Sequence, residues 1–192
     1  MSEIAVVFHS ATGTTRKLAE AVQAGAAGVA GAAATLHEIR PLDIVDGRWK
    51  NDALLSALDA ADAIVFGCPT FMGGPSAQMK AFLDGTLPRW YARVWVGKLG
   101  AAFTVSSTPS GDKLQTLTAI AVTAMQHGML WVGVEDSPLN AAQANRLGIY
   151  VGAAGQADYT TQPPGVQAAD LRTGERLGER VAKLAQRLRA TA

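Results

Sequence analysis

Short, uninterrupted apolar runs alternate along this chain with longer segments in which apolar residues recur at helical spacing. The runs at residues 4–8 and 63–68 contain no polar interruption, which is typical of strands buried on both faces. Between them, Leu18, Val22, and Ala26 fall on one face of a helix. Buried strands separated by helices predict an α/β fold whose parallel sheet is covered on both sides.

Five apolar runs have the length of strands, and they lie at residues 4–8, 33–39, 63–68, 100–105 and 129–134. Helical spacing predicts a helix that begins at Thr14 and further helices at residues 54–58, 75–84, 114–125 and 177–188, with Pro75 in the first turn of its helix. Loops are expected at residues 88–98 and 135–165. This arrangement predicts a doubly wound, five-stranded parallel sheet of flavodoxin-like order 2-1-3-4-5 with helices on both faces. No repeat or composition break divides the chain, so a single domain over residues 1–192 is expected.

Composition excludes several classes of protein. Of the 192 residues, 48% are hydrophobic and 17% are charged, which is typical of a compact globular protein. A net charge of +1 gives no electrostatic reason to expect a nucleic-acid partner. No apolar stretch is long enough for membrane insertion, and the N-terminus lacks the pattern of a signal peptide. The single cysteine, Cys68, agrees with a reducing compartment, so a cytoplasmic protein is expected.

The first predicted strand is followed at once by the loop S-A-T-G-T-T, residues 10–15. Ligands of doubly wound sheets bind beyond the carboxyl ends of the strands, so this loop lies at the expected binding edge. It also precedes a helix, whose free N–H groups and dipole favour an anion. One Ser or Thr at a helix start is an ordinary cap, but four hydroxyl groups around Gly13 exceed what a cap requires. The loop is therefore a candidate phosphate site.

The absence of two motifs narrows the classes of ligand that this loop is expected to bind. The chain contains no G-x-x-x-x-G-K-[ST], whose lysine reaches the outer phosphates of a nucleoside triphosphate, and its first turn lacks the dinucleotide pattern G-x-G-x-x-G. Arg16 and Lys17 follow the loop, but a helix that begins at Thr14 would point both into solvent. A monophosphate held by neutral donors is the better prediction. Residues 69–74 and 106–113 form two further loops at the same edge.

Several linked motifs carry a resemblance to a known family. V-V-F-x-S-x-T-G-x-T at residues 6–15 is similar to a flavodoxin phosphate loop. G-C-P-T-F-M-G-G at residues 67–74 leads into S-x-Q-M-K-x-F-L-D at residues 76–84. G-K-L, S-S-T and H-G-M follow in order, the last at residues 127–129. Together they resemble the WrbA-type NAD(P)H:quinone oxidoreductases of the flavodoxin-like superfamily, over nearly the whole chain.

The resemblance implies that the chain binds FMN. The phosphate would be held by Ser10, Ala11, Thr12, Gly13, Thr14 and Thr15. One edge of the isoalloxazine would be lined, through backbone N–H groups, by Pro69, Thr70, Phe71, Met72 and Gly73. The far side of the ring would be bordered by Ser106, Ser107, Thr108, Pro109, Ser110, Gly111, Asp112 and Lys113. Trp90 matches a family tryptophan near the substrate site and His127 matches a histidine beside the flavin, so these two are the candidate catalytic residues.

The resemblance also implies the reaction. NAD(P)H would deliver a hydride to flavin N5, and a quinone or similar small molecule would then take two electrons at the same face. His127 would donate a proton or a hydrogen bond. Members of the family are commonly tetrameric, so a homo-oligomer, dimer or tetramer, is expected, and the loop around Trp90 would reach a neighbour's site. Thr12 stands where the family often has a tyrosine near the nicotinamide. P-S-G-D-K at residues 109–113 replaces a glycine-rich loop, and its proline and Lys113 are expected to change the shape and the charge of that wall.

Other interpretations stay open. A flavodoxin-type electron carrier has the same fold, although such carriers tend to be acidic and this chain has 17 basic and 16 acidic residues. A flavin or azo-dye reductase shares both the cofactor and the donor. His127 would equally suit a helix C-terminus before a capping glycine. Trp90 and Trp95 would either line a quinone site or bury area at a subunit contact, and Cys68 is expected to be a small buried apolar residue. No spacing predicts a metal site.

Overall fold

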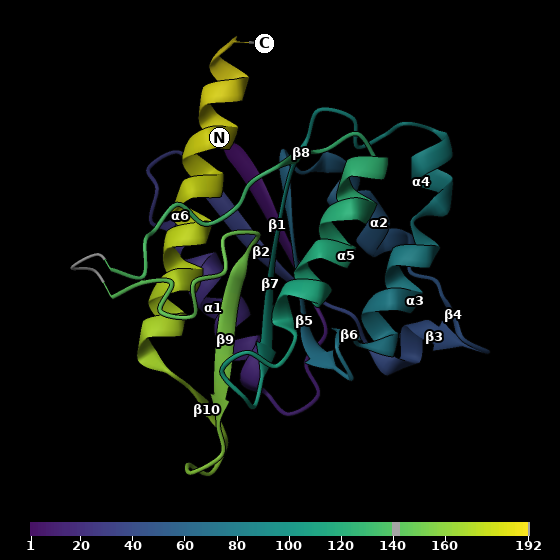
Figure 1. The fold of residues 1–192 in the computed structure, drawn as a ribbon. Coiled ribbons are helices and arrows are strands. Elements are labelled where there is room, and N and C mark those ends of the chain that lie inside the picture. The colour runs from purple at the N-terminus through teal and green to yellow at the C-terminus, as the bar shows by residue number, and fades with distance from the viewer. Residues whose placement is uncertain (140–142, 192) are drawn as a thin grey trace.

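A computed structural model describes residues 1–139 and 143–191 and contains one large central sheet (Figure 1). Its strands follow the order β10-β9-β7-β5-β1-β2, and the β1–β2, β1–β5, β5–β7 and β7–β9 pairs are parallel. The strands of this path are β1 (Ser2–Phe8), β2 (Ala32–Glu38), β5 (Ala63–Phe71), β7 (Leu99–Ser106), β9 (Ala153–Asp158) and β10 (Gly165–Val166). The five parallel strands, taken in chain order, have the order 2-1-3-4-5, which confirms the predicted flavodoxin-like fold.

The fifth strand is not where the sequence analysis places it. Of residues 129–134, only β8 (Leu130–Trp131) pairs with the start of β7, whereas β9 pairs with the end of β7. The loop expected over residues 135–165 therefore contains a strand; its residues 140–142 lie outside the described part of the chain. The sequence of β9, A-A-G-Q-A-D, has no large apolar residue, so its burial leaves no periodic pattern to detect.

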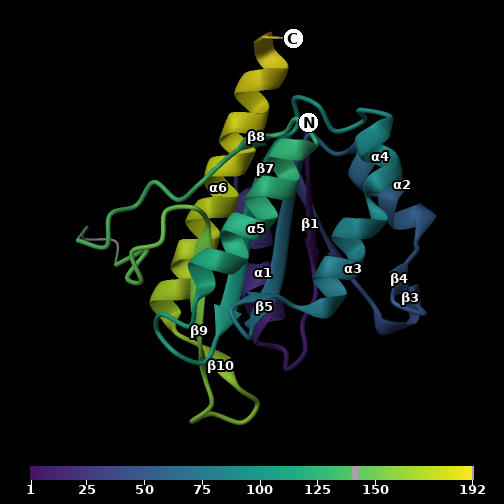
Figure 2. The same cartoon turned by 45° about the vertical axis from the view of Figure 1, so that its right-hand side comes forward.

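Helices cover both faces of the sheet, as predicted (Figures 1 and 2). On one face lie α1 (Thr14–Ala27) and α6 (Ala168–Thr191). On the other lie α2 (Asp52–Ala60), α3 (Ala77–Gly85) and α5 (Lys113–Gln126). Smaller elements complete the chain: the helical turns η1 (Pro41–Asp43) and α4 (Leu87–Tyr91), the paired strands β3 (Ile44–Val45) and β4 (Arg48–Trp49), and β6 (Gly74–Pro75).

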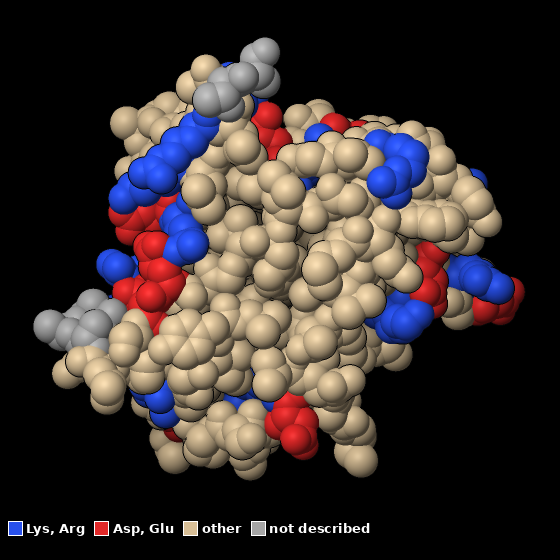
Figure 3. All heavy atoms as spheres, turned by 45° about the horizontal axis from the view of Figure 1, so that its top comes forward, with Lys and Arg blue, Asp and Glu red and all other residues tan. Residues whose placement is uncertain are grey.

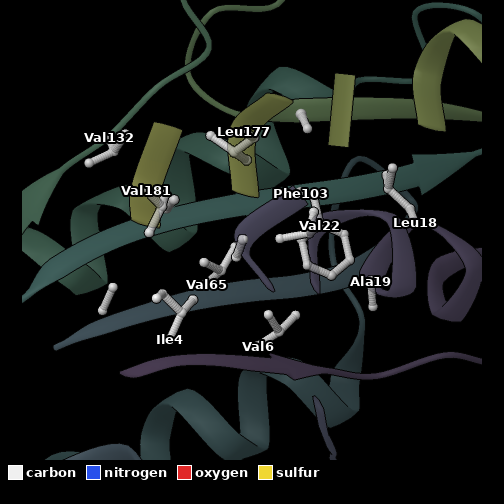
Figure 4. Close-up of a cluster of buried hydrophobic side chains, with 14 of the residues drawn as sticks. Ile4, Val6, Leu18, Ala19, Val22, Val65, Phe103, Val132, Leu177 and Val181 are labelled. Atoms are coloured by element: carbon white, nitrogen blue, oxygen red, sulfur yellow. The ribbon is translucent and has the colours of Figure 1, made fainter. Parts of the chain in front are cut away.

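The two hydrophobic cores follow from the alternation of side chains along each strand. In β1, Ile4, Val6 and Phe8 point toward α1 and α6, whereas Ala5 and Val7 point toward α2 and α5. Figure 4 shows the first of these cores, with Val22 of α1 and Leu177 and Val181 of α6 meeting the strands.

Glycines allow α1 and α6 to approach closely. A Cβ on Gly25 would lie 1.8 Å from the Glu175 backbone oxygen, and one on Gly178 would lie 1.9 Å from the Val22 oxygen. Gly25, which lies on the face of α1 that packs against α6, is therefore required for this close approach.

One of the predicted helix starts is confirmed and another is wrong. The start of α1 at Thr14 is confirmed. In contrast, α3 begins at Ala77 rather than at Pro75, because Ser76 caps it by accepting a hydrogen bond from the Met79 N–H (3.3 Å). Pro75 instead pairs with Thr70 in the β5–β6 hairpin, so the predicted loop at residues 69–74 is partly strand. The predicted loop at residues 88–98 contains most of α4.

Candidate functional site

The three predicted loops meet at the carboxyl edge of the sheet, because β1, β5 and β7 run parallel and end there. The His9 N–H at the end of β1 donates to the Gly67 oxygen of β5 (2.9 Å). The His9 Nδ1 also lies 2.9 Å from the Ser76 Oγ, just before α3. The second and third loops are neighbours, since a Cβ on Gly73 would lie 3.8 Å from the Asp112 Cβ.

The first loop leaves several polar groups without partners. Gly13 precedes α1 with φ 87°, and no side chain caps the helix there. The Arg16 N–H donates to the Ser10 Oγ (3.2 Å), and the Thr12 and Thr14 hydroxyls lie 3.2 Å apart. Within the described residues, the Thr14 and Thr15 N–H groups form no hydrogen bond, and the buried Thr15 Oγ1 has no partner. Buried hydroxyls are normally paired, so these groups fit a phosphate that would accept their hydrogen bonds.

The two cations after this loop are engaged elsewhere. Arg16 forms an ion pair with Glu38, and its guanidinium carbon lies 5.2 Å from the centre of the Phe8 ring. The Lys17 Nζ donates to the Pro164 oxygen (2.9 Å). Both side chains therefore turn away from the loop, as the helix start at Thr14 predicts, although they meet protein partners rather than only solvent. Ser10 is half-buried, and Ala11 and Thr12 are exposed at the tip.

The second loop is a tight hairpin with an apolar tip. Met72 and Gly73 connect β5 to β6 with φ 48° and 76°, and two positive φ values are typical of a type I′ turn. Phe71 is half exposed and Met72 is fully exposed. Thr70 differs, because its buried hydroxyl lies 2.8 Å from the Thr104 Oγ1 and donates to the Thr116 Oγ1 (2.9 Å). The Thr70 side chain is thus engaged in the core rather than with a ligand, and Pro69 is likewise buried within β5.

The third loop is exposed from Ser107 to Ser110 and returns to the body of the protein through two residues with positive φ, Gly111 and Asp112. The sequence suggests that Lys113 adds a charge to the wall of the site. The structure corrects this expectation, because Lys113 is fully buried and its Nζ donates to the Thr108 oxygen (2.5 Å) beneath the loop. Burial lowers the pKa of Lys113 to about 8.

Trp90 and His127 lie at the opposite edge of the sheet. The 14 residues of α5 span about 20 Å between the third loop and His127. Beyond His127, Leu130 pairs with Leu99 at the start of β7. Figure 1 shows α4, which carries Trp90, and β8 at the end of the molecule opposite β6. Trp90 and His127 line a groove of about 550 Å³ together with Thr86 and Leu87. Within one chain, the structure does not bring these two residues to the three loops.

Contacts fix the ring of His127. The Thr86 hydroxyl donates to the Leu83 oxygen (2.7 Å), so it accepts from the His127 Nε2–H (2.9 Å). The His127 Nδ1 is buried and has no partner among the described residues. Burial and the nearby Arg93 lower the pKa of His127, which keeps the ring neutral at pH 7. His127 also ends α5 before Gly128, as the alternative interpretation expects.

The burial of Trp95 and Cys68 decides between the interpretations of these two residues that the sequence leaves open. Trp95 is 1% exposed, packs 4.5 Å from the His127 ring, and donates from Nε1 to the Asp59 Oδ1 (2.7 Å). It therefore cannot line an open quinone site. Cys68 is buried, and burial raises the pKa of its thiol to about 12, which confirms it as an inert apolar residue. Across the described ranges, no group of His, Cys, Asp or Glu could hold a metal, and no helix could cross a membrane.

Comparison with known proteins identifies the family. The sequence profile of the NADPH-dependent FMN reductases matches residues 4–142, which is more than half of the chain. The chain belongs to this family. A NAD(P)H dehydrogenase (quinone) of Archaeoglobus fulgidus is 38% identical over 98% of this chain and 100% of its own length. Flavodoxin FldP of Pseudomonas aeruginosa is 35% identical over 99% and 100%, respectively.

A solved structure extends the comparison. The flavodoxin, WrbA-like protein from Agrobacterium tumefaciens is 37% identical, aligns over 97% of this chain and 99% of its own, and superposes with a TM-score of 0.74. The resemblance to WrbA-type proteins is thereby confirmed. At the level of the family, an oxidoreductase with FMN as cofactor and NAD(P)H as donor is confirmed as well.

Proposed function

We propose that the three loops at the carboxyl edge hold FMN and that the protein uses it to pass two electrons from NAD(P)H to a quinone. The observation that carries this proposal is the first loop, where the buried Thr15 hydroxyl and the first N–H groups of α1 have no partner among the described residues. A phosphate is the group that such a set of neutral donors would bind. Bound FMN would supply the redox chemistry, with hydride entering at N5.

Each loop has a distinct role in this proposal. Residues 10–15 would hold the phosphate through hydroxyl and N–H groups. Residues 69–73 would line one edge of the ring through their backbone, and the exposed Phe71 and Met72 would shield it from water. Residues 106–112 would border the far side, where N–H groups would stabilise negative charge that develops on reduction.

We further propose that Trp90 and His127 complete the site of a second copy of the chain. The end of the molecule that carries them has a broad area without charged side chains (Figure 3), with Arg48, Lys80 and Asp84 beside the groove. Large apolar side chains are exposed there, namely Leu87, Trp90, Tyr91, Val94, Val96, Val122, Met125 and Leu130. An exposed apolar patch of this kind is typical of a subunit interface. Trp90, which is 36% exposed, would reach the acceptor, and His127 would lie beneath it. A dimer or tetramer by light scattering supports this assembly, and a monomer contradicts it.

Two other functions are alternatives, because the name of one relative favours the first and the name of the family favours the second. FldP is a flavodoxin by name and matches the whole chain, which favours an electron carrier. The family name favours reduction of free FMN. The near-neutral charge of the chain supports an enzyme over a carrier, since carriers dock through complementary charge. We place the protein in the cytoplasm, in agreement with its one free, buried cysteine.

Two measurements test the proposal. The purified protein should bind FMN stoichiometrically, as measured by quenching of FMN fluorescence. With FMN bound, it should oxidise NADH or NADPH rapidly when benzoquinone is present and slowly when only free FMN is added. Absence of FMN binding refutes the proposed site. Binding without turnover by either nicotinamide indicates a carrier, and turnover that depends on free FMN indicates a flavin reductase.

A further inference from the structure

Lys113 occupies a position that is unfavourable for a charged side chain. It is the first residue of α5 and is 0% exposed. The positive end of the helix dipole lies there, which disfavours a cation. Burying an ammonium group also costs free energy unless the group is well paired. A lysine at this place therefore needs strong compensating contacts.

Those contacts are made almost entirely by the third loop. The Lys113 Nζ donates to the backbone oxygens of Thr108 (2.5 Å), Pro109 (3.0 Å) and Ser110 (3.4 Å). Two charged groups influence it from the neighbouring elements, Asp170 of α6 and Arg146 of the segment before β9. These two pair with each other, since the Arg146 guanidinium donates to the Asp170 Oδ2 (2.9 Å). The carbonyls thus remain the main partners of the ammonium.

This arrangement orients the peptide groups of the loop. In a trans peptide the C=O and N–H bonds point in opposite directions. Because the Pro109 and Ser110 oxygens point inward to Lys113, the N–H groups of Ser110 and Gly111 point outward. Neither N–H forms a hydrogen bond within the part of the chain that the structure describes. The third loop adjoins the second loop at Asp112, since a Cβ on Gly73 would lie 3.8 Å from the Asp112 Cβ.

We propose that Lys113 is a positioning residue whose ammonium group holds the third loop in the shape that presents these N–H groups to the cofactor. The role rests on the proposed function, because it assigns the cofactor to the same three loops. In this chain one buried charge would set the loop conformation that a glycine-rich loop reaches through the conformational freedom of its backbone. Deprotonation relieves the cost of burying the charge, but the neutral amine has one proton fewer and forms weaker hydrogen bonds, so the three carbonyls are oriented less strictly. Burial lowers the pKa of Lys113 to about 8, which places this change near neutral pH.

The test compares Lys113→Met, which keeps the aliphatic stem without the charge, with the wild type. Hydrogen exchange of a peptide covering residues 106–115, measured at pH 7 without FMN, should be about tenfold faster in Lys113→Met, as expected when charge-assisted hydrogen bonds are lost. The FMN dissociation constant should rise in the wild type with a midpoint near pH 8. In Lys113→Met it should be about tenfold higher at pH 7 and should show no such step.

Lys98→Met is the matched control. The Lys98 Nζ also donates to a backbone oxygen, that of Asp59 (2.9 Å), but at the opposite edge of the sheet. Its loss should change neither the loop exchange nor the pH profile of FMN binding. Equal loop exchange in Lys113→Met and the wild type overturns the proposal, as does a step near pH 8 that persists in Lys113→Met. If the wild type binds no FMN at any pH, the proposed function fails, and the exchange measurement still decides the role of Lys113.

Discussion

The first and third loops occupy the same edge of the sheet but satisfy their backbones in opposite ways. The first loop precedes α1 without a cap, and it leaves the Thr15 hydroxyl and two N–H groups unpaired within the described chain. The third loop precedes α5 and receives three hydrogen bonds from a buried cation of its own, Lys113. One loop is thus open to an external anion, whereas the other is fixed from inside.

This difference indicates that the two loops contribute to the proposed site in different ways. A loop with free donors gains most from a bound phosphate, so its energetics should respond to the ligand. A loop held by an internal ammonium should respond to pH.

The largest effect is expected at Lys113. A lysine whose pKa is lowered in the folded state destabilises the protein below pH 8, and this cost disappears as the pH rises to 10.5, the ordinary value. Relative to Lys113→Met, the free energy of unfolding of the wild type should increase by up to about 3 kcal/mol over that interval. Urea unfolding at several pH values measures it. A constant difference between the two proteins would contradict the buried charge.

The second prediction concerns two hydroxyls of the first loop, those of Ser10 and Thr15. Replacing Ser10 by Ala and Thr15 by Val should raise the FMN dissociation constant about 100-fold, because each hydroxyl would donate to a charged phosphate. Fluorescence titration measures the change. Ser56→Ala, which removes an exposed hydroxyl bonded to the Asp52 oxygen on α2, is the control and should bind FMN like the wild type.

A smaller effect is expected from the backbone of the same loop. Gly13 has φ 87° and open space around its Cα, so a side chain there meets strain rather than collision. Gly13→Val should weaken FMN binding about tenfold, since a β-branched residue at positive φ costs roughly 1–2 kcal/mol. The same titration checks it. An unchanged affinity would show that this loop conformation is not required for binding.

The smallest effect is expected at Arg16. Its ion pair with Glu38 is partly exposed, and its guanidinium faces Phe8 rather than the loop. Arg16→Gln should alter FMN affinity by less than about threefold, and stability by less than about 1 kcal/mol. A loss of tenfold or more in affinity would mean that a cation, rather than neutral donors, holds the phosphate.

Much of this architecture could be predicted from the sequence. Uninterrupted apolar strands such as residues 63–68 identify a doubly wound sheet, and the topology of such sheets places three loops at one edge. The hydroxyl-rich first loop was visible because its residue types are unusual in that combination. β9 was missed because its buried positions are alanine and glycine, whose small side chains give no periodic signal.

The remaining features depend on tertiary structure. A lysine at a helix start is normally solvated, so nothing in the sequence distinguishes the burial of Lys113; its position against the helix dipole was the one available hint. The separation of His127 from the loops could have been found, since the predicted helix at residues 114–125 is too long for both of its ends to reach one site. Trp95 was ambiguous because burial of an aromatic side chain depends on its partners, here His127 and Asp59.

The central claim, that the first loop holds a phosphate, is tested most directly by comparing FMN with riboflavin on the wild-type protein. The two ligands share the ring and differ in the phosphate alone. Riboflavin should bind at least about 100-fold more weakly at pH 7, because its ribityl hydroxyl cannot replace a charged acceptor at the N-terminus of α1. Equal dissociation constants for the two ligands would contradict it.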